Sequence, residues 1–246
     1  MRNYVLEDKY RYTAKSFSDG MQDKYYRNGY YYKQDKVGNE GYVEHLVSVL
    51  LSCSTLGKDE YVSYEYCKIN NKLGCRSKSF LKENEEFITA NKLYETMSGE
   101  LNLANKLASM QGASDRLRFI VDLYSSVGIN ERLSLDYFSK VFLLDYIILN
   151  TDRHMRNIGV IKRNSSFRLV PIFDNGNSLD TDRRGTTIAS TISGSFEEQL
   201  VIMRYPVVPK FKIYKNKFRR ELNNIEDRYE KEVLVKRLRN NGFLFI

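Results

Sequence analysis

The chain has 246 residues, of which 42% are hydrophobic, 13% aromatic and 28% charged. This composition supplies enough apolar material for a core and excludes the disordered and collagen-like classes. The length fits two lobes that share a cleft. The formal net charge is +8, from 39 Lys and Arg against 31 Asp and Glu.

The excess positive charge is concentrated near the C-terminus. Residues 204–246 hold 12 Lys and Arg against 5 Asp and Glu, so the rest of the chain is nearly neutral. Such a segment could attract nucleic acid or an acidic protein surface. Its apolar residues recur near helical spacing, which favours an amphipathic surface helix over nucleic-acid binding; they are Leu222, Ile225, Tyr229, Val233 and Leu234.

Compartment signals are weak but agree with one another. No apolar run reaches the roughly 18 residues that span a bilayer, and the N-terminus lacks the apolar region of a signal peptide. Three cysteines, Cys53, Cys67 and Cys75, form neither an even framework nor a metal-ligand pair. We therefore expect a cytoplasmic protein with no transmembrane segment and no disulfide.

The first 80 or so residues are predicted to be strand-rich, with one helix. Residues 10–33 alternate polar and aromatic side chains, and Asn28-Gly29 predicts a hairpin turn. Residues 38–53 switch to helical spacing, which places apolar side chains on one face, namely Val43, Leu46, Val47, Leu50 and Leu51. Further strands are expected at 61–69 and near 75–81, separated by Asn70-Asn71.

From about Glu83 the pattern predicts helices, over 83–97, 102–110, 114–127 and 134–150. Ser114 and Ser134 are candidate N-caps, and Gly128 is a candidate end for the third helix. The last helix is apolar almost all round, so Asp145 inside it must be paired. Two short β-like runs follow, at 158–163 and 166–173.

The stretch from Leu149 to Gly176 carries the chemistry. Phosphoryl transfer from ATP needs a carboxylate that orients the attacking hydroxyl or accepts its proton, and oxygen ligands for Mg²⁺. Asp152, Asn157 five residues later, and Asp174 at the far end of a hairpin supply that set. Protein kinases space their catalytic-loop Asp and metal-binding Asn identically, although here the order DRH replaces HRD.

The run LDYIILNTDRHMRNIGVI, followed by FRLVPIFDNG, resembles the catalytic core of HipA-like serine/threonine kinases. This bacterial group is related to protein kinases and more distantly to phosphoinositide kinases. The resemblance implies an α+β, bilobal, protein-kinase-like fold, with a strand-rich nucleotide-covering lobe over 1–92 and a mainly helical lobe over 93–246. It also implies that Asp152 is the catalytic base and that Asn157 and Asp174 bind Mg²⁺.

Other residues of the loop have two interpretations each. His154 either takes part in catalysis or holds the loop in shape by packing and hydrogen bonding. Arg153 binds a phosphorylated residue or anchors the loop. Asp145 is expected to be structural and to accept hydrogen bonds from the loop backbone or from Arg153.

The resemblance extends to the N-terminal region. The segment FSDGMQDKYY is similar to the family's phosphate-covering loop, in which a serine can be autophosphorylated; Ser18 is the first candidate and Ser16 the second. Lys33 ends the next strand and is the candidate lysine for the nucleotide phosphates. Glu40 and Glu44 lie one helical turn apart. One of them should pair with Lys33, and Glu44 is favoured because it lies inside the helix.

The residues of the loop thus predict an ATP- and Mg²⁺-dependent kinase. The resemblance implies that its acceptor is a serine or threonine of a protein, with autophosphorylation in the N-terminal loop. Expected partners are the protein substrate and an antitoxin or other regulatory protein. Three alternatives remain open: a small-molecule or phosphoinositide kinase, a non-catalytic nucleotide-binding module, and a nucleic-acid-binding protein acting through residues 204–246.

Overall fold

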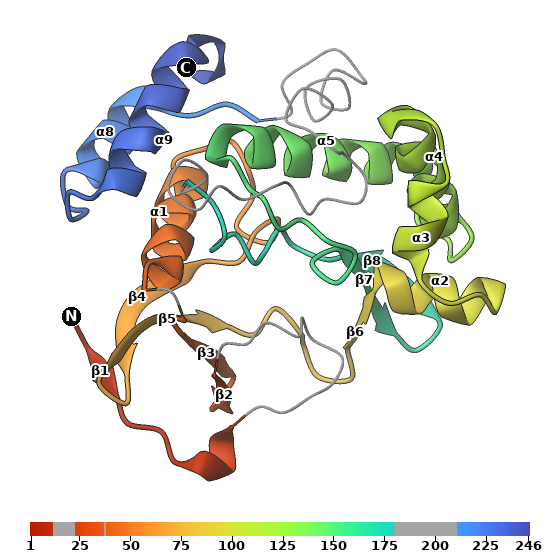
Figure 1. The fold of residues 1–246 in the computed structure, drawn as a ribbon, viewed down its shortest axis with the longest axis horizontal. Coiled ribbons are helices and arrows are strands. Elements are labelled where there is room, and N and C mark those ends of the chain that lie inside the picture. The colour runs from red at the N-terminus through yellow and green to blue at the C-terminus, as the bar shows by residue number, and fades with distance from the viewer. Residues whose placement is uncertain (12–22, 37, 180–210) are drawn as a thin grey trace. The chain divides into compact units, whose positions relative to one another are not determined.

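The computed structural model describes residues 1–11, 23–36, 38–179 and 211–246. The chain divides into two compact units (Figure 1). Among the described residues, the first unit combines those within 1–80, 173–179 and 211–246, and the second combines 81–172. Residues 173–179 and the C-terminal segment therefore belong to the same unit as the N-terminal sheet. The lobe boundary at residue 92 stays a prediction.

The first unit is built on a five-stranded sheet in the order β1-β4-β5-β3-β2. β1 runs parallel to β4, and the other neighbours are antiparallel. A short 3₁₀ turn, η1 (Asp8–Tyr10), lies between β1 and β2. The strands are β1 (Asn3–Tyr4), β2 (Lys24–Arg27), β3 (Tyr30–Gln34), β4 (Tyr64–Ile69) and β5 (Lys72–Lys78).

The hairpin turn predicted at Asn28-Gly29 is present, and Asn70-Asn71 separates two strands as expected. Asn28 and Gly29 between β2 and β3 have φ of 51° and 76°, and Asn70 and Asn71 between β4 and β5 have φ of 48° and 67°. Two-residue hairpins need this left-handed backbone at both central positions, and Asn and Gly tolerate it best. The sheet register therefore follows from local turn chemistry.

The helix α1 (Glu40–Ser52) packs against β4 and β5. The start of α1 approaches the sheet so closely that a Cβ on Gly41 would lie 2.4 Å from the backbone carbon of Gly74. A Cβ on Gly74 would lie 2.1 Å from the carbonyl oxygen of Lys33. Glycine at these two positions lets α1 pack closely on β5 and lets β5 approach β3. The buried face of α1 is the predicted one, namely Val43, Leu46, Val47, Leu50 and Leu51.

The C-terminal segment belongs to the first unit and forms α8 (Lys215–Leu222), α9 (Tyr229–Asn240) and a 3₁₀ turn, η2 (Gly242–Leu244). α8 packs on α1 (Figure 1). Phe218, Leu234 and Leu238 are buried. The expected amphipathic helix is thus two helices, and residues 223–228 interrupt the periodicity on which that expectation rested.

The second unit contains a three-stranded sheet and helices. The sheet order is β6-β7-β8, with both pairs antiparallel. Its strands are β6 (Glu86–Thr89), β7 (Gly159–Arg163) and β8 (Ser166–Leu169), and its helices are α2 (Ala90–Ser98), α3 (Leu103–Ala108), α4 (Gly112–Ser125) and α5 (Glu131–Ile148).

The helix predicted over 83–97 is wrong in its first half. Residues 86–89 form β6, which pairs with β7, and α2 begins only at Ala90. The hydroxyl of Thr89 accepts a hydrogen bond from Lys92 N at 3.1 Å and caps the helix. A strand partner that lies about 70 residues away in the chain decides this segment's conformation.

The predicted caps of the later helices are also wrong. α4 starts two residues before Ser114, at Gly112. The Asn130 side chain caps α5, and Ser134 is buried inside that helix. α5 is otherwise as apolar as predicted, with Val141 to Leu144 at most 1% exposed. The described α+β architecture confirms the predicted fold class.

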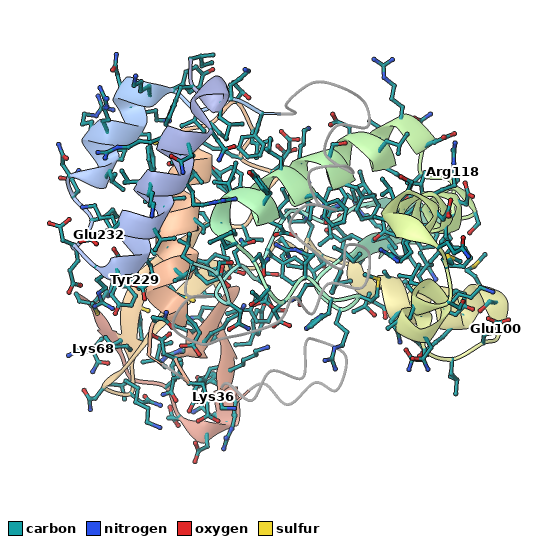
Figure 2. The ribbon with its side chains drawn as sticks, turned by 45° about the horizontal axis from the view of Figure 1, so that its top comes forward. Lys36, Lys68, Glu100, Arg118, Tyr229 and Glu232 are labelled. Carbon is teal, nitrogen blue, oxygen red and sulfur yellow. The ribbon has the colours of Figure 1, made fainter. Side chains whose placement is uncertain are left out.

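The structure also bears on two expectations from the sequence, which concern transmembrane segments and disulfides. None of the helices within the described ranges is long and apolar enough to cross a bilayer. Cys53, Cys67 and Cys75 are all buried and free, as expected. On β4, buried Cys67 and Ile69 alternate with exposed Lys68 (Figure 2).

Candidate functional site

A charged cluster in the first unit joins three segments of the chain. Lys33 at the end of β3 places its Nζ 2.6 Å from Asp174 Oδ1 and 3.4 Å from Glu44 Oε1. The Lys33–Glu44 ion pair predicted from the sequence is therefore present. Glu40 instead holds the start of α1, because its Oε2 accepts hydrogen bonds from the backbone N–H groups of Gly38 and Asn39, at 2.9 and 3.3 Å.

The electrostatics of the cluster favour a charged lysine. Burial by itself lowers the pKa of Lys33, but the Asp174 carboxylate, with contributions from Tyr64 and Glu44, raises it well above the ordinary value. Burial raises the pKa of Glu44, while the Lys33 ammonium and the N–H of Asn175 oppose that rise. Lys33 thus holds a permanent cation between two carboxylates.

Asp174 has an unusual backbone conformation. Its φ is +60°, in the left-handed region that non-glycine residues seldom adopt. Its N–H donates to the hydroxyl of Tyr64 at 3.4 Å, and the N–H of Asn175 donates to Glu44 Oε2 at 3.0 Å. Tertiary contacts hold this strained segment in place, as is common where a side chain must be aimed at a ligand.

A pocket that is open to solvent lies beside the cluster in the first unit. Lys33 and Asp174 line it together with apolar and aromatic side chains. The rings of Phe80 and Phe173 lie 5.5 Å apart between centroids. A cation and a carboxylate next to flat apolar walls suit a ligand that has an aromatic part and an anionic part. The other lining residues are Lys24, Tyr31, Tyr32, Val62, Tyr64 and Ser77.

In the second unit, the loop after α5 is built around a buried ion pair. Arg153 donates to Asp145 through Nε and Nη2, at 3.0 and 2.9 Å, and the two side chains are 1% and 0% exposed. Asn150 Nδ2 donates to Asp145 Oδ1 at 2.8 Å. Asp145 is therefore paired as expected, and Arg153 anchors the loop.

The same loop presents Asp152 and Asn157. The side chain of Asp152 is 35% exposed, and its N–H donates to Asn150 Oδ1 at 2.9 Å. Asn157 Nδ2 donates to the carbonyl oxygen of Asp152 at 3.0 Å, which fixes the orientation of the amide. Asn157 Oδ1 is buried, and none of the residues that the structure describes donates a hydrogen bond to it.

The orphaned oxygen, Asn157 Oδ1, bears on whether the loop can bind a metal ion. A buried acceptor without a donor is costly unless something else satisfies it. Amide and carboxylate oxygens are the protein ligands that Mg²⁺ prefers. Asn157 Oδ1 therefore fits a cation ligand, as predicted from the sequence.

His154 lies next to Asp152 in the loop. Its Nδ1 accepts the N–H of Arg156 at 3.2 Å, so the ring proton belongs on Nε2, 3.9 Å from Asp152 Oδ1. This contact supports the shape-holding interpretation of His154. Its catalytic role stays a prediction.

The structure brings Lys33, Glu44 and Asp174 together in the first unit, and Asp152, His154 and Asn157 together in the second. Ser18 and Ser16 lie outside the described residues. Sequence reasoning missed Tyr64 as a support for Asp174. In a chain with 19 tyrosines, a single tyrosine on a strand gives no local signal of such a contact.

Comparison with known proteins identifies the fold. No family model matches the sequence, and no curated protein matches it either. Solved structures do match, and they show that the chain has the fold of HipA-like kinases. The resemblance predicted from the loop residues is confirmed at the level of the fold.

Two of these structures illustrate the match. The Helicobacter pylori proinflammatory kinase CtkA aligns with a TM-score of 0.63 at 14% identity, over 99% of this chain and 94% of that one. HipA in the Shewanella oneidensis MR-1 complex of HipA, HipB and operator DNA aligns with a TM-score of 0.55 at 13% identity, over 97% and 67% respectively.

Proposed function

We propose that this chain is an ATP-dependent kinase. The observation that carries the proposal is the Lys33–Asp174–Glu44 cluster at the edge of an aromatic pocket. A buried ammonium offers charge to the phosphates of a nucleotide, and aromatic walls offer a surface to its base. The likeness in fold to two proteins named as a kinase and as a toxin of the HipA type supports this interpretation.

The two clusters have complementary roles in this proposal. Lys33, held by Glu44, binds the phosphates. Asp174 in the first unit and the orphaned oxygen of Asn157 in the second are each a proposed ligand of Mg²⁺, which when bound would neutralise the charge that develops on the phosphates. The exposed carboxylate of Asp152 orients the acceptor hydroxyl and takes its proton.

In the transfer itself, the acceptor oxygen forms a bond to the γ-phosphorus while the bond between that phosphorus and the β–γ bridging oxygen breaks. ADP leaves with the bonding electrons, and the hydroxyl proton passes to Asp152. The protein contributes mainly by positioning and by electrostatic stabilisation.

The acceptor we propose is a serine or threonine hydroxyl of a protein, with Ser18 of the same chain as an autophosphorylation candidate. The sequence resemblance to HipA-like kinases supports this choice. The HipA structure also contains HipB, which supports a regulatory or antitoxin-like partner for this chain as part of the proposal.

Nucleotide titration by calorimetry, together with transfer of radiolabelled phosphate from ATP, tests the proposal. Asp152→Asn should keep Mg²⁺-ATP binding and lose transfer by about 10²-fold or more, because only the transition state needs the base. Asp174→Asn should weaken Mg²⁺-ATP binding itself. Asp122→Asn, an exposed aspartate on α4, is the matched control and should behave as wild type.

The outcomes separate the rival functions. Wild-type protein that binds no Mg²⁺-ATP would overturn the proposal. Binding without transfer to any protein acceptor would favour a nucleotide-binding module. Transfer to phosphoinositide in vesicles, but not to protein, would favour a lipid kinase.

A further inference from the structure

The C-terminal segment, residues 211–246, forms hydrogen bonds with the C-terminal end of α1 and the residues that follow it. Tyr214 N–H donates to Cys53 O at 2.8 Å, and Thr55 N–H donates to Lys212 O at 2.9 Å. The ammonium of Lys217 also donates to Ser52 O. This segment is the basic tail of the sequence, and part of it serves to fix the helix that carries Glu44.

The same segment also forms hydrogen bonds with the N-terminal end of α1. The hydroxyl of Tyr42 donates to the carbonyl oxygen of Glu226 at 2.6 Å, and Asn39 Nδ2 donates to Glu230 Oε1 at 3.0 Å. Glu230 lies in the first turn of α9, in which Figure 2 labels Tyr229 and Glu232. α1 is therefore held at both of its ends by residues that follow it by more than 150 positions.

Arg228 is the centre of the contact at the start of α1. Its guanidinium carbon lies 4.6 Å from the ring centroid of Tyr42 and 5.4 Å from that of Tyr66 on β4. Its Nη2 lies 2.9 Å from Glu226 Oε2, and the side chain is 24% exposed. A partly desolvated cation over two aromatic rings is a favourable contact. Through Arg228, the loop that precedes α9 contacts both α1 and the sheet.

The position of α1 determines the charged cluster. Tyr42 and Glu44 lie in the same helix, within one turn, so a shift of one carries the other. The Lys33–Glu44 distance of 3.4 Å is already near the limit of a hydrogen bond. A small outward movement of α1 would break this contact and the bond from Asn175 N–H to Glu44 Oε2.

We propose that Arg228 is a positioning residue for the phosphate-binding lysine, acting through Tyr42 and α1 on Glu44. The inference rests on the proposed function, since the property that it controls is nucleotide affinity. It gives the C-terminal segment a part in the site without any direct contact to the nucleotide.

Replacement of Arg228 by methionine keeps the aliphatic stem and removes the cation. Arg228→Met should weaken Mg²⁺-ATP binding by about threefold to tenfold, measured by calorimetry at a temperature where the variant is folded. The Mg²⁺-ATP affinity of Arg228→Lys should lie between that of wild type and that of Arg228→Met, because lysine keeps the charge but loses the planar stacking on the rings. Arg220→Met on α8, where the side chain is 74% exposed, is the control and should bind as wild type.

A double-mutant cycle separates positioning from general stabilisation. If Arg228 acts through Glu44, Arg228→Met should weaken binding much less in a Glu44→Gln background than alone. Equal weakening in both backgrounds would overturn the proposal, as would unchanged affinity of Arg228→Met with only a lower melting temperature.

A milder variant keeps the test decisive if Arg228→Met does not fold. Tyr42→Phe removes only the hydroxyl bond to Glu226 and should weaken binding about twofold to threefold, again less so with Glu44→Gln. Unchanged affinity would count against the proposal. Absence of Mg²⁺-ATP binding by the wild type would instead show that the proposed function, and this inference with it, is wrong.

Discussion

Each of the two units contains an ion pair at its candidate site residues, and the two pairs differ in their exposure to solvent. Arg153 and Asp145 in the second unit are 1% and 0% exposed. Lys33 and Asp174 in the first unit are 14% and 21% exposed and line a pocket. The sealed pair can only hold a loop in shape, whereas the pair at the pocket can exchange a carboxylate for a ligand's anion.

The largest effect should come from breaking the sealed pair. Arg153→Met leaves the Asp145 carboxylate buried with the Asn150 amide as its remaining donor, and should lower the free energy of unfolding by about 3–5 kcal/mol. Denaturant unfolding measures the loss. The double variant Asp145→Leu, Arg153→Met should lose less than Arg153→Met alone. A single-variant loss below about 1 kcal/mol would contradict a structural role for the pair.

Breaking the pair at the pocket should act on binding more than on folding. Lys33→Met removes the cation that we propose binds the phosphates, and should weaken Mg²⁺-ATP affinity at least tenfold, or about 1.4 kcal/mol. The loss of unfolding free energy should be smaller than for Arg153→Met, because Asp174 reaches water and Glu44 keeps the N–H of Asn175. Lys72→Met, at an exposed site of β5, is the matched control. Unchanged affinity of Lys33→Met would remove the lysine from the site.

The smallest effect should come from a third ion pair, between Arg168 and Glu85. This pair lies in the second unit, and its arginine is exposed to solvent. Arg168 donates to Glu85 through Nε and Nη2, at 3.0 and 2.6 Å, and its hydrogen bonds lower the pKa of Glu85 from 4.5 to about 2. A carboxyl with a lowered pKa in the folded state stabilises the fold above its unfolded pKa, and this contribution is lost as the pH falls toward 2. The side chain of Arg168 is 41% exposed, so solvent screens the pair.

Arg168→Met should therefore lower the free energy of unfolding by only about 1 kcal/mol at pH 7. Unfolding curves from pH 7 to pH 2 should show the difference from wild type shrinking below about pH 4.5. A difference that stays constant over this range would mean that the pair contributes through packing of the arginine stem and not through charge.

Several features of the site could be predicted because their cause is local. Asn157 bonds to the backbone of Asp152 in the same loop, Asp145 pairs with Arg153 in the loop that follows its helix, and Lys33 pairs with Glu44 in the next element of the chain. In each case a short stretch of sequence contains both the group and the reason that it needs a partner.

Other features could not be predicted, because their cause lies elsewhere in the chain. Tyr64 supports Asp174, which follows it by 110 positions. Residues 86–89 have a helical pattern but form a strand, since β7 offers them hydrogen bonds that a first helical turn cannot match. The contact of Arg228 with Tyr42 has no sequence signal, because charged residues near aromatic ones are common on surfaces.

The sequence by itself determined the turns, the buried face of α1, the apolar α5 and the residue types of the site, because backbone preference and hydrophobic periodicity act over a few residues. Only the tertiary structure decided that residues 173–179 and the basic C-terminal segment belong to the same unit as the N-terminal sheet, and that Asp174 takes a left-handed backbone beside Lys33. Those outcomes depend on burial and hydrogen bonding between segments that are distant in the chain, and no local pattern encodes which distant segment will supply the partner.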